Sequence, residues 1–230
     1  DARGYGASFG PTVTAFADYA DDLFGVFDAL HIERALVVGH SMGGRILLEA
    51  ARRDQNRFAA MVLSGAQAAY LEHMTPAERQ EYVAKREVLF VGDTPDPAAA
   101  RKVAESVLAP DASAEAQEAM VSHFMALRRE GFVAALTASV GMDARDVLPR
   151  ITVPTQVVGG VLDPICPIEE TRRIAASIGQ GHAIEFAGVA HMANVEAPTL
   201  FADVVDAFVS THAGAATVAN ANDLLHAGPR

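Results

Sequence analysis

One ten-residue stretch constrains the fold of this chain more than any other: Ala35-Leu36-Val37-Val38-Gly39-His40-Ser41-Met42-Gly43-Gly44. An apolar run of strand character leads into a serine between small residues, and apolar side chains at helical spacing follow. This G-x-S-x-G layout is typical of a tight strand-to-helix turn that presents one serine hydroxyl at its tip. We expect glycine at 39 and 43 because a Cβ at either place would clash as the strand and the helix close on each other.

Further strand signals place this turn in a larger α/β pattern. A second apolar strand covers 60–64 and ends at Gly65, about thirty residues after the first strand begins, which predicts a parallel βαβ unit. Strand patterns return at 155–160 and 182–187, with helices expected at 13–30, from Pro167 to 178 and from Pro198 to 211. The sequence therefore predicts an α/β fold with a mostly parallel sheet flanked by helices.

The segment 67–148 differs from the rest, because strand signals vanish and alanine-rich helical patterns replace them. Helices are expected from the capping box at Thr75 to about 90, at 97–108, at 113–130 with a stop at Gly131, and at 132–140. Its place between strands favours an all-helical cap, or lid, although it could instead complete the core. We divide the chain into a core of 1–66 and 149–212, a cap of 67–148, and a loosely ordered tail of 213–230.

Composition excludes several classes of function. The formal net charge of −11 argues against nucleic acid or an anionic membrane surface as a partner. Cys166 is the only cysteine, so the chain has no intrachain disulfide and no cysteine-based zinc site, and we expect it to be a small buried residue. No apolar run approaches the roughly 18–20 residues that span a bilayer. We expect no metal and no cofactor.

Three predicted strand-end loops each contribute one residue of a nucleophilic site. Ser41 follows the first strand, Asp163 follows the strand at 155–160, and His191 follows the strand at 182–187. A serine needs a base to take its proton, and that base is usually a histidine oriented by a buried carboxylate. Asp163, which precedes a proline, could instead be only a turn residue, and His191 could be a core histidine. We expect His40 to pack or hydrogen-bond locally rather than to act as the base, and His123 to lie on the surface of the cap.

With these residues in place, the chain resembles the α/β-hydrolase superfamily, specifically capped serine esterases and lactonases similar to 3-oxoadipate enol-lactonase. The resemblance covers residues 1 to about 211, and it is carried by the stretches 1–6, 35–44, 151–155, 159–164 and 188–198. It implies that Ser41 is the nucleophile, Asp163 the acid and His191 the base, and that the backbone N–H of Met42 is one oxyanion donor. The order Ser, Asp, His along the chain is the one found in this fold.

The resemblance also implies an absence. In the family, the motif seen here as Asp1-Ala2-Arg3-Gly4 follows several strands, one of which supplies the second oxyanion donor. Those strands and their turns would take roughly 40–50 residues. We therefore expect the chain to be an N-terminally truncated segment of a longer hydrolase.

The expected function is a serine hydrolase that cleaves a carboxylic ester or lactone of a small molecule through an acyl-enzyme. A carbon–carbon bond hydrolase and a cofactor-free perhydrolase share the same triad and stay open as alternatives. A non-catalytic homologue that only binds a small molecule is the alternative from another class. A homo-oligomer is possible, and the expected compartment is the cytoplasm.

Overall fold

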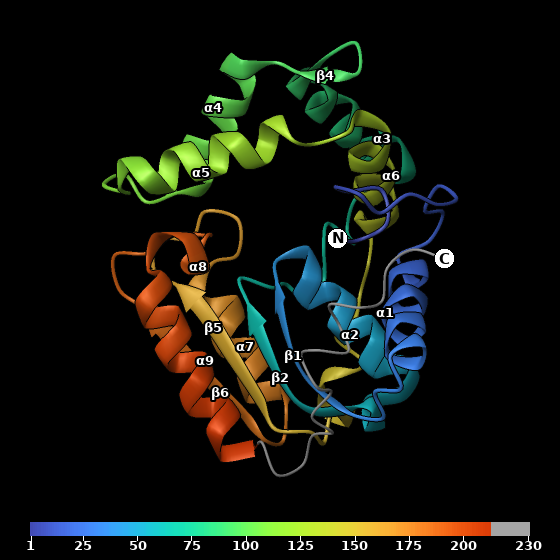
Figure 1. The fold of residues 1–230 in the computed structure, drawn as a ribbon, viewed down its shortest axis with the longest axis vertical. Coiled ribbons are helices and arrows are strands. Elements are labelled where there is room, and N and C mark those ends of the chain that lie inside the picture. Colours follow the sequence, from blue (N-terminus) through green and yellow to red (C-terminus); the bar gives the residue numbers. More distant parts are fainter. Residues whose placement is uncertain (213–230) are drawn as a thin grey trace.

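The computed structural model describes residues 1–212, so the tail predicted at 213–230 lies outside the described residues. Four parallel strands form the central sheet in the order β1-β2-β5-β6 (Figure 1). The strands are β1 (Ala35–His40), β2 (Phe58–Ser64), β5 (Thr155–Gly160) and β6 (Gly181–Phe186). The α/β class with a parallel sheet, predicted from the strand patterns, is confirmed.

Helices cover both faces of this sheet. One face packs against α1 (Ala17–Ala29), α2 (Met42–Asp54) and α7 (Ile168–Ser177) through a cluster that includes Leu48, Phe58 and Ile174. The other face packs against α9 (Pro198–His212), where Val62 and Phe186 meet Phe208. The short helix α8 (Ala193–Glu196) precedes α9 at the carboxyl end of the strands. Strand β2 is buried over its whole length, which explains why its sequence is an unbroken apolar run.

The four helices between β2 and β5 form a layer above the carboxyl ends of the strands, and the chain then runs back down beside the sheet (Figure 1). Its helices are α3 (Pro76–Arg86), α4 (Pro97–Val107), α5 (Ala114–Met125) and α6 (Arg129–Ser139). The predicted capping box opens α3, since the Thr75 hydroxyl accepts from the Glu78 N–H and the Glu78 carboxylate accepts from the Thr75 N–H. We keep the term cap for residues 67–148; the division into core and cap stays a prediction.

Three expectations about these elements need correction. The cap is not all-helical, because strands β3 (Phe90–Val91) and β4 (Thr94–Pro95) pair around Gly92, whose φ is +61°. The first helix begins at Ala17 rather than 13, since the Asp18 carboxylate accepts the N–H groups of residues 14 and 15 and holds them in a turn.

The third correction concerns Gly131, which does not stop a helix but lies in the first turn of α6. Its Cα packs against the N-terminal loop, and a Cβ there would lie 1.9 Å from the carbonyl oxygen of Gly4. The glycine therefore serves a close contact between segments far apart in the sequence. Within residues 1–212, no helix has both the length and the apolar character needed to cross a membrane. Whether further strands precede Asp1 stays a prediction.

Candidate active site

Ser41 lies at the tip of the turn between β1 and α2. Its backbone has φ of 50° and ψ of −110°, a conformation that residues other than glycine rarely adopt. The turn is held to the neighbouring strand because the Ser41 N–H donates to the Ser64 carbonyl at 2.8 Å. The strain and this hydrogen bond together present the Ser41 hydroxyl above the end of the sheet.

Of the two glycines expected to be required around Ser41, one is required and the other is not. A Cβ on Gly39 would lie 2.6 Å from the Gly43 carbonyl carbon, so glycine is required at 39 as predicted. A Cβ on Gly43 would meet nothing within 4 Å, so the expected clash at that position is wrong. The second close approach falls one residue later, since a Cβ on Gly44 would lie 2.5 Å from the Ala66 Cβ.

Asp163 lies in the loop after β5 and is buried, with 6% of its surface exposed. Its Oδ1 accepts from the N–H groups of Ile165 at 2.7 Å and Cys166 at 2.8 Å. These two bonds leave Oδ2 free to face the histidine. Asp163 is therefore also a turn residue, as the alternative interpretation of the sequence had it, and the turn fixes the direction of its carboxylate.

His191 follows β6 and connects the other two predicted residues. Its Nδ1 lies 2.8 Å from Asp163 Oδ2, and its Nε2 lies 2.9 Å from Ser41 Oγ. All three predicted side chains thus form one hydrogen-bonded chain, drawn from loops at the carboxyl ends of three parallel strands. With Nδ1–H donated to the carboxylate, Nε2 has its lone pair directed at the serine hydroxyl and can accept its proton.

Met42 is the first residue of α2. The first N–H groups of a helix have no acceptor within the helix, and the helix dipole favours negative charge at that end. The position predicted for the oxyanion donor is therefore one where a backbone N–H is available next to Ser41.

Two residues next to the three hydrogen-bonded side chains are neutral near pH 7. His40 packs its ring 5.0 Å from the His191 ring, and its Nδ1 lies 3.3 Å from Ser64 Oγ. Burial, with a smaller contribution from His191, lowers the pKa of His40 to about 4. Burial also raises the pKa of Cys166 to about 12, and its thiol donates to the Ala66 carbonyl at 3.0 Å. These positions agree with the local packing expected of His40 and the burial expected of Cys166. His123 is exposed on α5, also as expected.

Sequence reasoning missed two charged residues near the site. Arg45, on α2, is 8% exposed, and its guanidinium lies 4.0 Å from the centre of the Tyr70 ring. Burial lowers the pKa of Arg45, and no carboxylate of residues 1–212 pairs with it within 4.0 Å. Glu196, on α8, bonds to the loop that carries His191. The sequence offers no signal for the burial of Arg45 or for the bonds of Glu196, because an arginine or a glutamate in a helix is ordinarily exposed.

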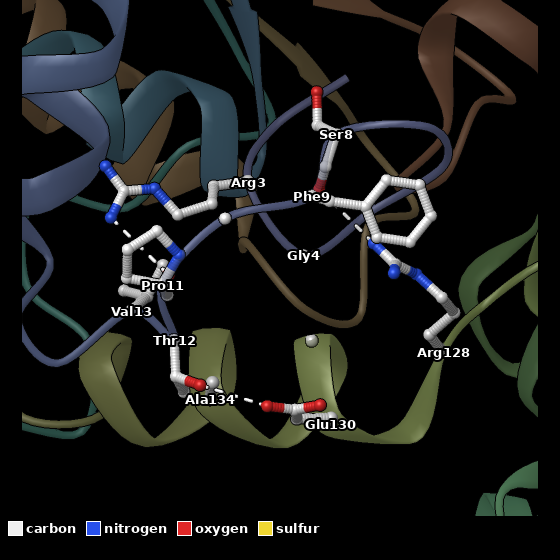
Figure 2. A pocket seen from close by; sticks show the side chains of 12 residues that line it. Arg3, Gly4, Ser8, Phe9, Pro11, Thr12, Val13, Arg128, Glu130 and Ala134 are labelled. Carbon is white, nitrogen blue, oxygen red and sulfur yellow. Dashed lines mark hydrogen bonds between the residues drawn. The ribbon is translucent and has the colours of Figure 1, made fainter.

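A separate cavity of about 170 Å³ lies between the N-terminal loop and the first turns of α6 (Figure 2). Arg3 and Arg128 line it from opposite sides, and the Arg128 guanidinium lies over the Phe9 ring, 4.2 Å from its centre. The residues that line the cavity include none of the three predicted catalytic residues. We assign it no part in the chemistry.

A parallel sheet between helices, with a strained serine at a strand–helix turn bonded to histidine and aspartate from later loops, defines an α/β-hydrolase. The chain belongs to the hydrolase family described as serine aminopeptidase, S33, whose family model matches residues 1–198.

Individual relatives agree with this assignment. A 3-oxoadipate enol-lactonase of Acinetobacter baylyi is 26% identical over 208 residues, which cover 90% of this chain and 76% of the relative. A thermophilic esterase from Thermogutta terrifontis has a TM-score of 0.80 and 26% identity, and the match covers 92% of this chain and 79% of the esterase. An enol-lactonase from Burkholderia xenovorans, with a TM-score of 0.76, 23% identity and coverage of 91% and 79%, shows likeness of fold alone.

Proposed function

We propose that this protein is a serine hydrolase that cleaves a carboxylic ester or lactone through an acyl-enzyme on Ser41. The observation that carries the proposal is the continuous hydrogen-bonded chain from Asp163 Oδ2 through His191 to Ser41 Oγ, with bonds of 2.8 and 2.9 Å. Relatives named esterase and enol-lactonase, at 26% identity, support the class of bond cleaved.

In the first half of the reaction, Ser41 Oγ attacks the carbonyl carbon of the substrate while His191 Nε2 takes the hydroxyl proton. Asp163 holds the imidazole in the tautomer that leaves Nε2 free and stabilises the positive charge that forms on the ring. The Met42 N–H and the start of α2 stabilise the negative oxygen of the tetrahedral intermediate. When the intermediate collapses, the leaving oxygen takes the proton from Nε2.

In the second half, a water molecule attacks the acyl carbon and gives its proton to the same Nε2. Collapse of the second intermediate returns the proton to Ser41 Oγ and releases the carboxylic acid. For a lactone, the alcohol and the acid are parts of one product, because the ring opens at the first step. The side chains named here supply every proton transfer in the cycle.

The identity of the relatives makes an enol-lactone the first cyclic substrate to test, since two enol-lactonases are 25–26% identical to this chain. Carbon–carbon bond hydrolysis and perhydrolysis would use the same three residues. The cap, which lies over the carboxyl ends of the strands, is the element expected to select among these substrates (Figure 1).

The decisive experiment combines a fluorophosphonate probe with turnover of short aryl esters and an enol-lactone. We expect one adduct per chain by intact mass, lost in Ser41→Ala and retained in Ser122→Ala, which changes an exposed serine of α5. Ester turnover should likewise be lost in Ser41→Ala and retained in Ser122→Ala. Saturable binding of an ester by a folded chain that neither labels nor turns over would instead favour the non-catalytic homologue.

A further inference from the structure

The carboxylate of Glu196 collects three backbone N–H groups from two different parts of the molecule. Its Oε1 accepts from Met192 at 2.9 Å, and its Oε2 accepts from Ala190 at 3.1 Å. These donors flank His191 on either side. The same Oε2 also accepts from Ala109 at 2.7 Å, and Ala109 belongs to the cap, just after α4.

A second bond ties the same two segments together. The backbone N–H of His191 donates to the carbonyl of Val107, the last residue of α4, at 3.1 Å. Three consecutive N–H groups of the histidine loop, 190 to 192, are therefore all held by Glu196 or by the cap. The backbone of His191 has to be held in place because the two short bonds of its imidazole to Asp163 and Ser41 depend on where that backbone lies.

From this geometry we propose that Glu196 is a positioning residue that couples the cap to the catalytic base. When the cap segment 107–109 is docked, Glu196 and the Val107 carbonyl hold the histidine loop so that Nε2 lies over Ser41 Oγ. When that segment moves away, the loop loses the bond to its central N–H, and Glu196 loses one of its three donors. The inference rests on the proposed function, because it assigns Glu196 a role through His191.

The proposal has a chemical basis in the number of acceptors. Charged acceptors form the stronger hydrogen bonds to backbone N–H groups, and a carboxylate can take all three donors at its two oxygens. A glutamine at 196 has one acceptor oxygen, and its amide NH₂ would face at least one backbone N–H. Glu196→Gln therefore loosens the loop while it keeps the size and shape of the side chain.

The test uses the whole chain and measures the rate of fluorophosphonate labelling, its endpoint, and kcat and KM for an aryl ester. In Glu196→Gln we expect the labelling rate and kcat to fall by about 10- to 100-fold, as a displaced catalytic group would cause. The endpoint should stay at one adduct per chain and KM should change less than about threefold. Glu105→Gln, at an exposed carboxylate of α4, is the matched control and should behave as the wild type.

A second variant acts from the cap side. Ala109→Pro removes the cap donor and places a ring carbon where its hydrogen pointed at Glu196 Oε2, so the carboxylate must give up its contact with the cap. Leu108 before it has φ of −106° and ψ of 158°, an extended conformation that suits a residue preceding proline. Hydrogen–deuterium exchange should then become faster in segment 188–196, although the substitution lies in the cap. In Glu196→Gln, exchange should become faster in both 105–112 and 188–196.

Wild-type labelling rates in both variants, or unchanged exchange of 188–196 in Ala109→Pro, would overturn the proposal. So would a labelling endpoint that falls in step with the rate, because that result indicates misfolded chains rather than a displaced base. If the wild type does not label at all, the proposed function fails, and exchange alone decides: faster exchange in both segments of Glu196→Gln supports the coupling, and unchanged exchange overturns it.

Discussion

At the scale of single residues, burial determines the charge state of the groups around Ser41. His40 touches the ring of His191 but stays neutral because burial opposes its protonation, so the site holds one histidine suited to act as a base. Cys166 lies three residues after Asp163 and donates its backbone N–H to that carboxylate, yet its raised pKa keeps the side chain a thiol. The site is therefore a serine site although it contains a cysteine.

The lowered pKa of His40 predicts a loss of stability on the acid side. The folded state binds a proton at His40 only near pH 4, whereas the unfolded chain binds it near pH 6.5. The free energy of unfolding is therefore unaffected by His40 above about pH 6.5. It falls as the pH drops toward 4, by about 3 kcal/mol in all, because only the unfolded chain takes up the proton. In urea unfolding at pH 6.5 and 4.5, His40→Asn should lose less stability between the two values than the wild type.

The control for this prediction is His182→Asn, at an exposed histidine of β6, which should lose as much stability as the wild type. Because carboxylates also titrate in this range, the informative quantity is the difference between variant and wild type. An equal loss in His40→Asn and wild type would contradict the buried, neutral state of His40.

At the scale of elements, the sequence predicts whatever depends on local pattern. The strands, the turn at Ser41 and the three strand-end loops follow from apolar runs, glycines and chain order, and parallel strands bring such loops to one edge. What could not be predicted depends on long-range contacts. Gly44 rather than Gly43 is packed closely because of Ala66, and one of the three donors to Glu196 lies 87 residues away in the cap.

Two helical glycines offer a direct comparison of local and long-range effects. Gly25 in α1 has nothing within 4 Å of its would-be Cβ, so Gly25→Ala should stabilise the fold by about 0.5–1 kcal/mol through helix propensity. Gly131 in α6 lies against Gly4, so Gly131→Ala should destabilise by about 1–3 kcal/mol through overpacking. Denaturant unfolding measures both. A neutral or stabilising Gly131→Ala would show that α6 does not approach the N-terminal loop as closely as described.

At the scale of the whole molecule, the two ends of the cap are bonded to each other, and the residues between them contact the core at two places. Its two connections bond to each other, since the Gly141 N–H donates to the Tyr70 carbonyl at 2.7 Å and the Tyr70 N–H donates to Met142 at 2.8 Å. The contact of α6 with the N-terminal loop and the bonds of segment 107–109 to the histidine loop join the cap to the core. The second of these contacts is the one on which the proposed coupling between the cap and His191 depends.

The sheet itself has an open side at β1, which among residues 1–212 pairs only with β2. Val38 on this strand is 46% exposed. An uncovered strand edge beside apolar side chains favours pairing with another chain, and a lysine opposes it. We therefore expect the 230-residue chain to self-associate with rising concentration, and Val38→Lys to shift it toward monomer in sedimentation velocity. Val91→Lys, at an exposed valine of the β3–β4 pair, should leave association unchanged, and a wild type that stays monomeric throughout would show that this edge is protected.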